Sequence, residues 1–296
     1  MFAVGHRTFA GDLAQVEDWL RLKVPFAFAR FNDGEWLILS GQAIDNGEFH
    51  FDPLSPPDAL ARQRLLAAFR YHSPNYLVGI SCTCCAEQAT VAAMRTICGQ
   101  PEERLTFAGL FANANYPAFK ERIIPLFQSY SNIFLICHEK GDASRLPFNV
   151  RQQFSVGTNA WINNQSLVEE LPQFISREKL TGALFLVSAG PFTKSIIQHL
   201  NAAHPQNTYL DTGSTLDPWI FGRTKYKWLD RLPKVFQGLP GILRGPGVTR
   251  SYHRPGRKSQ RLCQWWTPAS EQELWALSES CLTSLQAPAD LGAGVS

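Results

Sequence analysis

The stretch Gly182-Ala-Leu-Phe-Leu-Val-Ser188 is the clearest strand signal in the chain, and the turn residues Ala189-Gly190-Pro191 follow it directly. A short apolar run bounded by turn residues is typical of a strand that is covered on both faces. Residues 193–203 then carry apolar side chains at helical spacing. A buried strand followed at once by a helix is the unit from which parallel sheets with helices on both faces are built. The stretch therefore predicts an α/β fold.

Strand and helix signals alternate on both sides of this stretch. Further strands are predicted at residues 25–31, 76–82, 106–112, 132–138, 152–156 and 208–211, and helices at 35–40, 55–71, 116–127 and 166–175. The alternation predicts a Rossmann-like, mainly parallel sheet with helices on both faces. We expect one α/β domain over residues 1–285, made of a core at about 25–220, a basic loop-rich part at 221–265 and a closing helix at 271–285, with a frayed tail at 286–296.

The charge of the chain is concentrated in one segment. Between Arg223 and Arg261 there are eleven Lys and Arg residues but one acid, Asp230, so this segment carries +10. Because the net charge is +3, the rest of the chain carries −7. Such a segment is either a solvated surface or a surface for a phosphate, an anionic glycan or an anionic lipid head group.

Composition and targeting signals exclude several classes of protein. The 296 residues are 45% hydrophobic, too apolar for a disordered chain, and the net charge is too small for a dedicated nucleic-acid binder. Neither a secretory signal nor an apolar run of about 18 residues is evident. We read the seven cysteines as reduced thiols and expect a cytoplasmic protein. No second pair of zinc ligands accompanies Cys82, Cys84 and Cys85. We therefore interpret these cysteines as small apolar residues at a strand end.

The first candidate site is Arg30-Phe-Asn-Asp-Gly-Glu-Trp36, which follows the strand predicted at 25–31. In open parallel sheets, ligands bind beyond the carboxyl ends of the strands. A tight turn can place the carboxylates of Asp33 and Glu35 on one side, and such oxygen ligands suit Mg²⁺ or Mn²⁺. Arg30 suits a phosphate. The alternative is a pair of solvated carboxylates.

The second candidate site is the loop from Ser188 to Lys194, between the clearest strand and its helix. Free backbone N–H groups and the positive end of a helix favour a phosphate at such a position, and Lys194 adds a charge. Gly190 and Pro191 do not match a Walker A or Gly-x-Gly-x-x-Gly spacing. The alternative is an ordinary strand-to-helix turn in which Pro191 starts the helix.

Two further strand ends carry polar residues. Asp211-Thr-Gly-Ser214 lies at the end of the last predicted strand. Asp211 could there bind a sugar hydroxyl, support a metal or act as a base, and the alternative is a residue that caps a helix. Asn159, in Gly157-Thr-Asn-Ala-Trp161, suits either a nucleotide base or loop packing. No nucleophile stands in a Gly-x-Ser-x-Gly elbow.

In this order along the chain, these segments resemble the GT-D-type glycosyltransferases of bacterial surface-glycan and glycoprotein assembly. The family's early Arg-aromatic-Gly-Asp-Gly-Glu motif is similar to residues 30–35, and its Asn-Ala-aromatic segment is similar to residues 159–161. Its strand-Gly-Pro-helix segment is similar to residues 186–194, and its Asp-x-Gly element to residues 211–213. The similarity spans about residues 25–220, and its specificity lies in the order and spacing of short motifs.

The resemblance implies a glycosyltransferase of surface polysaccharide or glycoprotein biosynthesis that moves a sugar from a nucleotide-sugar donor to a glycan or lipid-linked glycan. It implies Mn²⁺ or Mg²⁺ on Asp33 and Glu35, and these two residues with Asp211 are the catalytic candidates. The donor-binding candidates are Arg30, Asn32, Asn159, Ser188, Gly190, Pro191, Lys194 and Ser214. Asn32 stands where the family has glycine, which alters the turn unless the asparagine takes the left-handed conformation that it tolerates better than most residues.

Two other functions remain open from the residues. The acidic turn and a metal also suit a hydrolase of nucleotides or phosphate esters. The same loops also suit a nucleotide- or glycan-binding module without catalysis. For a transferase, the basic segment 223–261 is outside the resemblance; it suits contact with an acceptor or, peripherally, with the inner face of a membrane.

Overall fold

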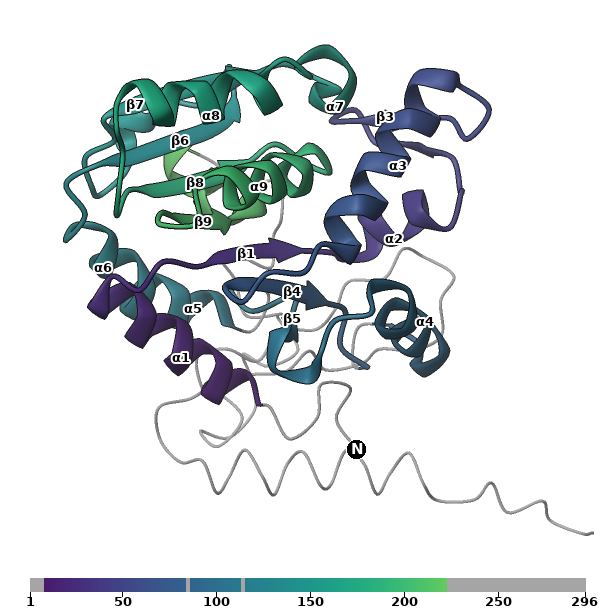
Figure 1. Cartoon of the computed structure of the whole chain (residues 1–296), viewed down its shortest axis with the longest axis horizontal. Coiled ribbons are helices and arrows are strands. Elements are labelled where there is room, and N and C mark those ends of the chain that lie inside the picture. Colours follow the sequence, from purple (N-terminus) through teal and green to yellow (C-terminus); the bar gives the residue numbers. More distant parts are fainter. Residues whose placement is uncertain (1–7, 84–85, 113–114, 223–296) are drawn as a thin grey trace, which may run out of the picture.

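Seven parallel strands form one sheet in the part of the chain that the structure describes, which is residues 8–83, 86–112 and 115–222 of a computed structural model (Figure 1). The strands are β1 (Ala27–Arg30), β4 (Tyr76–Ile80), β5 (Leu105–Phe107), β6 (Ile133–His138), β7 (Gln152–Val156), β8 (Leu184–Ser188) and β9 (Thr208–Asp211). Their order across the sheet is β5-β4-β1-β9-β8-β6-β7, and every neighbouring pair is parallel.

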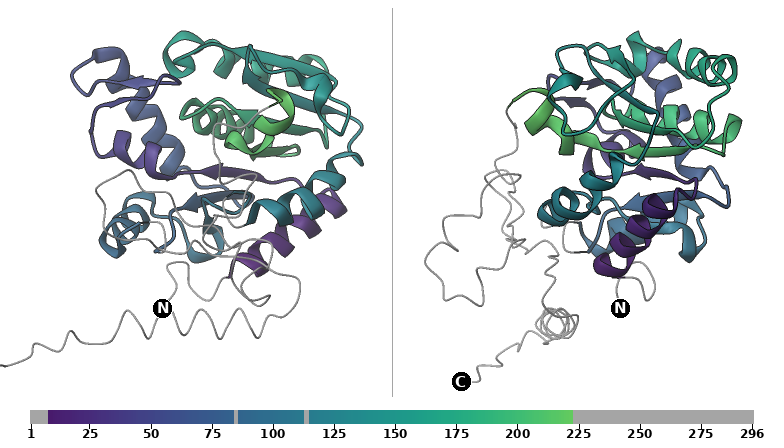
Figure 2. Two further views of the ribbon diagram at one scale, coloured as in Figure 1. Left: turned by 180° about the vertical axis from the view of Figure 1, so that it is seen from behind. Right: turned by 90° about the vertical axis from the view of Figure 1, so that its left-hand side faces the viewer.

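Helices cover both faces of this sheet, as the views in Figures 1 and 2 show. One face carries α3 (Pro56–Arg70), α8 (Leu167–Arg177) and α9 (Phe192–Ala203). The other carries α5 (Tyr116–Ala118), a π-helical turn (Phe119–Ile123) and α6 (Ile124–Phe127), with α1 (Phe9–Leu22) packed against α6. The Rossmann-like fold with helices on both faces is therefore confirmed.

Further elements belong to the described part. They are α2 (Asp33–Leu39), α4 (Gln88–Cys98), α7 (Ala160–Asn163), α10 (Asp217–Ile220), the 3₁₀ turns η1 (Glu102–Arg104), η4 (Ala143–Arg145) and η5 (Gly213–Leu216), and a two-stranded antiparallel sheet of β2 (Ile44–Asp45) and β3 (His50–Phe51).

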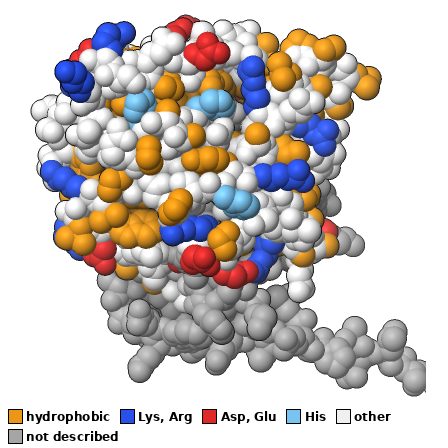
Figure 3. Space-filling view, in the orientation of Figure 1, with side chains coloured by type: hydrophobic (Ala, Val, Ile, Leu, Met, Phe, Trp, Pro, Cys, Tyr) orange, Lys and Arg blue, Asp and Glu red, His pale blue; other side chains and the backbone are white. Residues whose placement is uncertain are grey.

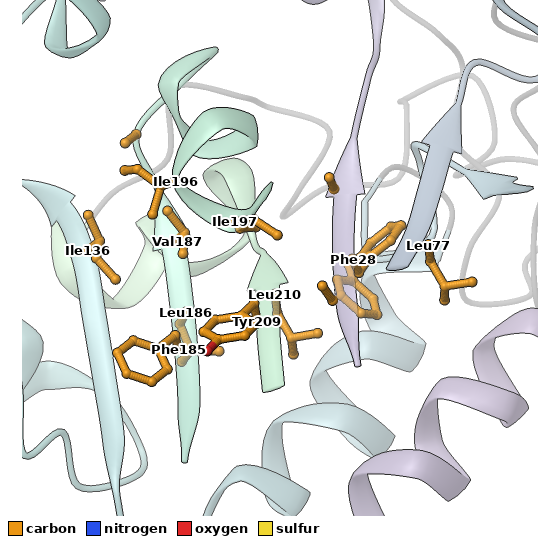
Figure 4. Packing of buried hydrophobic residues seen from close by; sticks show 14 of the residues in the cluster. Phe28, Leu77, Ile136, Phe185, Leu186, Val187, Ile196, Ile197, Tyr209 and Leu210 are labelled. Carbon is orange, nitrogen blue, oxygen red and sulfur yellow. The ribbon is translucent and has the colours of Figure 1, made fainter. Parts of the chain in front are cut away.

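The core lies between the sheet and its helices because the central strands are apolar along their whole length. Leu184, Phe185, Leu186 and Val187 of β8 have no exposed surface. Figure 4 shows Ile196 of α9 beside Val187. Each fully buried aliphatic or aromatic side chain contributes about 1.5–3 kcal/mol relative to an exposed one, so this layer is the main source of stability.

Several elements differ from the sequence prediction, among them α4, which was not predicted. Helix α1 was not predicted, although Thr8 caps it by accepting a hydrogen bond from Gly11 N at 3.0 Å. The strand predicted at 106–112 is shorter, because β5 ends at Phe107. Helix α2 begins at Asp33 rather than Glu35, so the predicted acidic turn is the first turn of a helix.

Several predictions lie outside the described residues. These are the basic segment beyond residue 222, the closing helix at 271–285, the tail at 286–296, and Cys84 and Cys85. Within the described ranges, no helix is long and apolar enough to cross a membrane. On the face drawn in Figure 3, charged side chains of both signs are interspersed rather than gathered by sign.

Candidate functional site

The carboxyl ends of β1, β9 and β8 are neighbours at one edge of the sheet. The chain leaves β1 towards β4 on one side, whereas β9 is reached from β8 on the other side. The strand order therefore changes direction between β1 and β9, and in open α/β sheets ligands bind at such a switch point. In Figure 1 this edge lies on the right, where α2 begins.

Three buried charges meet at this edge. The ammonium of Lys194, on α9, lies 2.6 Å from Oε1 of Glu35 and 3.1 Å from Oδ2 of Asp211. The three side chains are 6%, 11% and 1% exposed, respectively. One ammonium between two carboxylates leaves this group, which we call the buried triad, with a formal charge of −1. The triad joins α9, α2 and β9.

Asp211 is engaged on both of its carboxylate oxygens. Oδ2 accepts from the backbone N–H of Arg30 at 3.0 Å as well as from Lys194, and Oδ1 accepts from Gly213 N at 3.1 Å. Gly213 has a φ of 48°, which glycine adopts without strain. The predicted catalytic role of Asp211 stays a prediction, and its burial favours a role in holding β1, β9 and α9 together.

Glu35 is also engaged on both oxygens. Oε2 accepts from Asn32 N at 3.0 Å, which caps the start of α2, while Oε1 binds Lys194. Asn32 itself is extended, with a φ of −111°, and its Oδ1 accepts from Ser81 Oγ at 3.0 Å. The left-handed turn considered for Asn32 is therefore not formed, because this residue precedes a helix instead of occupying the tip of a turn.

The charges of the buried triad set its protonation. Burial alone raises the pKa of Glu35, but the charge of Lys194 and its hydrogen bond outweigh burial and lower it. Burial alone lowers the pKa of Lys194, but Asp211 and Glu35 outweigh burial and raise it. At neutral pH the ammonium and the Glu35 carboxylate are both charged.

Asp33 differs from Glu35 although one residue separates them. Asp33 is exposed. The pKa of its carboxyl is raised, first by partial loss of solvation and second by the negative charge of Glu35. The two carboxylates predicted as joint metal ligands therefore have different environments: Asp33 carries an unfavourable negative charge, whereas Glu35 is already neutralised by Lys194.

The phosphate-loop candidates lie beside the triad, but Lys194 does not face an open loop. Gly190 has a φ of 58°, and Pro191 precedes rather than starts α9. The ammonium of Lys194 contacts Gly190 O at 3.3 Å and is otherwise bound to the two carboxylates. Direct contact of Lys194 with a donor phosphate would require breaking these ion pairs, so its donor-binding role stays a prediction that the geometry does not favour.

Arg30, Ser188 and Ser214 are all at this edge. The guanidinium of Arg30 is half-buried, and its Nε donates to Ala108 O at 2.5 Å. The hydroxyl of Ser188 donates to Gly213 O at 2.5 Å, which ties β8 to the loop after β9. Ser214 is half-buried in η5. The structure brings these three candidates together with the triad at neighbouring strand ends.

Asn159 lies farther along the same edge, after β7, and contacts the hairpin of β2 and β3. Its backbone N–H donates to Glu48 O at 3.0 Å, and its Oδ1 accepts from His50 N at 3.3 Å and from Trp161 Nε1 at 2.7 Å. The sequence analysis missed this hairpin, residues 44–51, because its two strands have two residues each.

Comparisons with known proteins find similar solved structures. No family model and no curated protein matches the chain. One solved structure, described as showing that the highly conserved domain of unknown function 1792 has a distinct glycosyltransferase fold, is 15% identical, with a TM-score of 0.46 over 76% of this chain and 91% of that chain. Another, described as a new glycosyltransferase (DUF1792) from Streptococcus sanguinis, is 16% identical, with a TM-score of 0.49 over 76% of this chain and 95% of that chain. Because the identities are this low, we base the proposed function on the side chains at the sheet edge.

Substitution of Glu35 by Gln is expected to produce a pH-dependent loss of stability. Because folding lowers the pKa of Glu35, its carboxylate stabilises the fold at a pH above the ordinary pKa of 4.5. This contribution is lost as the pH falls through the lowered pKa of the folded state. The Glu35→Gln variant should therefore lose about 1–3 kcal/mol of unfolding free energy at pH 7, and less at pH 3.5. Urea unfolding at both pH values measures this, with the exposed Glu139→Gln as the control. A loss that is equal at both pH values would contradict the ion pair.

Proposed function

We propose that the protein is a metal-assisted glycosyltransferase that moves a sugar from a nucleoside diphosphate sugar to a glycan or lipid-linked acceptor. The observation that carries the proposal is the gathering of Arg30, Asp33 and the buried triad at the switch point between β1 and β9. Glycosyl transfer requires stabilisation of a diphosphate leaving group, and charged groups fixed beforehand supply it.

The charge of this group supports participation of a cation. Arg30 and Lys194 are positive, whereas Asp33, Glu35 and Asp211 are negative, so the five side chains carry a formal charge of −1. A diphosphate is itself strongly anionic and would be repelled by an excess of carboxylates. A divalent cation reverses the sign of the local charge, which removes this repulsion.

Asp33 fits a divalent cation. Its carboxylate is exposed, and a cation would offset the loss of solvation and the neighbouring Glu35 charge, which together raise its pKa. No group of three or more His, Cys, Asp or Glu side chains suited to a metal occurs among the described residues. Asp33, with Glu35 close by, would therefore hold Mn²⁺ or Mg²⁺ only together with donor phosphates and water, as is common for Mg²⁺. A bound cation would supply electrostatic stabilisation of the leaving diphosphate.

The chain's own groups have separate tasks in this proposal. The half-buried guanidinium of Arg30 binds phosphate oxygens, because its planar fork matches their geometry. The start of α9, a twelve-residue helix, presents its positive end to the same anion, whereas the backbone N–H groups of Ala189, Thr193 and Lys194 are already hydrogen-bonded within the loop. The buried triad holds α2 and α9 in position, so that Asp33 and the Gly190 loop face the same ligand.

The acceptor side of the proposal concerns the basic segment 223–261, which lies outside the described residues. Its charge of +10 suits an anionic glycan or the phosphate of a lipid carrier at the inner face of the membrane. Binding to anionic vesicles that weakens with added salt would support this part of the proposal.

Turnover of the donor tests the proposed function. Purified full-length protein is incubated with a panel of nucleotide sugars and Mn²⁺, with and without a lipid-linked or soluble glycan, and release of nucleoside diphosphate is measured. Release that requires both the cation and an acceptor is the expected result. Equal release without acceptor would instead identify a hydrolase, and binding without release would identify a binding module.

A further inference from the structure

The hairpin of residues 44–51 is fixed at its tip and along its second strand. Oδ1 of Asn46 accepts from the backbone N–H groups of Glu48 and Phe49, at 3.0 and 3.1 Å. Asn159 binds Glu48 and His50 through its backbone N–H and its side-chain oxygen. The hairpin therefore presents Phe49 in a defined position, although its own ladder of two-residue strands is too short to do so alone.

Trp161 strengthens the same attachment. Its ring packs edge-on against Phe51 at 5.7 Å and against Phe49 at 6.3 Å between ring centroids. Its Nε1 donates to Oδ1 of Asn159 at 2.7 Å, the atom that also accepts from the hairpin. Asn159 holds a left-handed conformation with a φ of 55°, which asparagine tolerates. Asn159 and Trp161, in the loop after β7 and at the start of α7, therefore both contact the hairpin.

The ring of Phe49 lies between the two glycines of the candidate site. A Cβ atom placed on Gly34 would lie 3.6 Å from Cζ of Phe49, and one placed on Gly190 would lie 3.8 Å from its Cδ1. Gly34 separates Asp33 from Glu35, and Gly190 lies in the loop before α9. One half-buried aromatic ring therefore borders both the acidic helix start and the phosphate-loop candidate.

We infer that Phe49 is a ligand-contacting residue, whose ring stacks on a ring of the nucleotide sugar next to its diphosphate, and that Asn159 positions it. This inference rests on the proposed function. An aromatic face beside a diphosphate site contributes affinity for a sugar or base ring but none for the phosphates themselves. The transferred sugar and the nucleoside are both rings joined to the diphosphate, and the choice between them is made by experiment.

Calorimetric titrations with Mn²⁺ test the inference. The probes are inorganic pyrophosphate, UDP, UDP-glucose, GDP and GDP-mannose. For the nucleotide that the wild type binds, Phe49→Leu should weaken binding of at least one ring-bearing probe about tenfold, which is within the range of aromatic stacking on a base. Binding of pyrophosphate should be unchanged. A loss already present with UDP or GDP indicates the nucleoside, and a loss seen only with the nucleotide sugar indicates the transferred sugar.

Two controls separate stacking from damage to the fold. Phe154→Leu makes the same change at a half-buried phenylalanine of β7, which is the outermost strand on one side of the sheet. This variant should leave all affinities unchanged. Asn159→Gly keeps the left-handed backbone but removes the side-chain oxygen, so it should weaken the same probes as Phe49→Leu. Asn159→Asp retains an acceptor and should restore most of the affinity.

The outcomes that contradict the inference differ from those that contradict the proposed function. If the wild type binds none of the nucleotides, both are overturned. If the wild type binds a nucleotide and Phe49→Leu binds it equally well, or loses pyrophosphate to the same extent, only the inference is overturned.

Discussion

Substitution of Lys194 by Met is expected to destabilise the protein by about 3–5 kcal/mol, the largest effect predicted here. The ammonium is 6% exposed and lies between the carboxylates of Glu35 and Asp211. Removing it leaves two buried negative charges without their cation, and breaking a buried ion pair from one side has a cost of this size. Urea unfolding at pH 7 measures the loss.

Comparison with two other variants tests the cause of this loss. Adding Glu35→Gln to Lys194→Met should recover part of the stability, because one of the unpaired charges is then absent. The exposed Lys140→Met should stay within about 0.5 kcal/mol of the wild type. If Lys194→Met instead unfolds like the wild type and loses affinity for pyrophosphate, Lys194 is a phosphate ligand and not an internal counter-ion.

Substitution of Asp33 by Asn should have the opposite profile, a large loss of ligand binding with little change in stability. Asp33 is exposed, and loss of solvation and the charge of Glu35 raise the pKa of its carboxyl. Its neutralisation should therefore leave the unfolding free energy unchanged or slightly increased at pH 7. Affinity for nucleotide sugars in Mn²⁺ should fall more than about a hundredfold. Residues that only support a metal ligand contribute up to about a hundredfold, and loss of a direct ligand should exceed this.

The controls for Asp33→Asn use the cation and a second aspartate. Without Mn²⁺, the variant and the wild type should bind the nucleotide with similarly low affinity. Asp18→Asn, on the surface of α1, should bind like the wild type. Full Mn²⁺-dependent affinity in Asp33→Asn would remove this residue from the metal site.

Most of the sheet could be predicted because its central strands are buried on both faces. The apolar runs that became β4, β6 and β8 are bounded by turn residues, and burial on both faces is what makes a strand continuously apolar. Helix α1 was missed, although Phe9, Leu13, Val16 and Leu20 repeat with helical spacing and are buried. This spacing is the usual signal of an amphipathic helix.

The candidate site could be predicted only in part, because a sequence pattern locates strand ends but not the order of strands. Arg30, Ser188 and Asp211 were identified since each ends a predicted strand. That β9 lies beside β1 is a property of the sheet, and it brings Asp211 to Lys194 and Glu35. Lys194 was consequently interpreted as a phosphate ligand. Phe49 was missed because its hairpin has no strand long enough to show alternation.

A crystal structure of the full-length protein with Mn²⁺ and a nucleotide sugar would test the central claim most directly. The account predicts an anomalous Mn²⁺ peak at coordination distance from the Asp33 carboxylate, a diphosphate between Arg30 and the Gly190 loop, and Lys194 still paired with Glu35 and Asp211. A peak away from Asp33, or a diphosphate bound elsewhere than between β1 and β9, would contradict it.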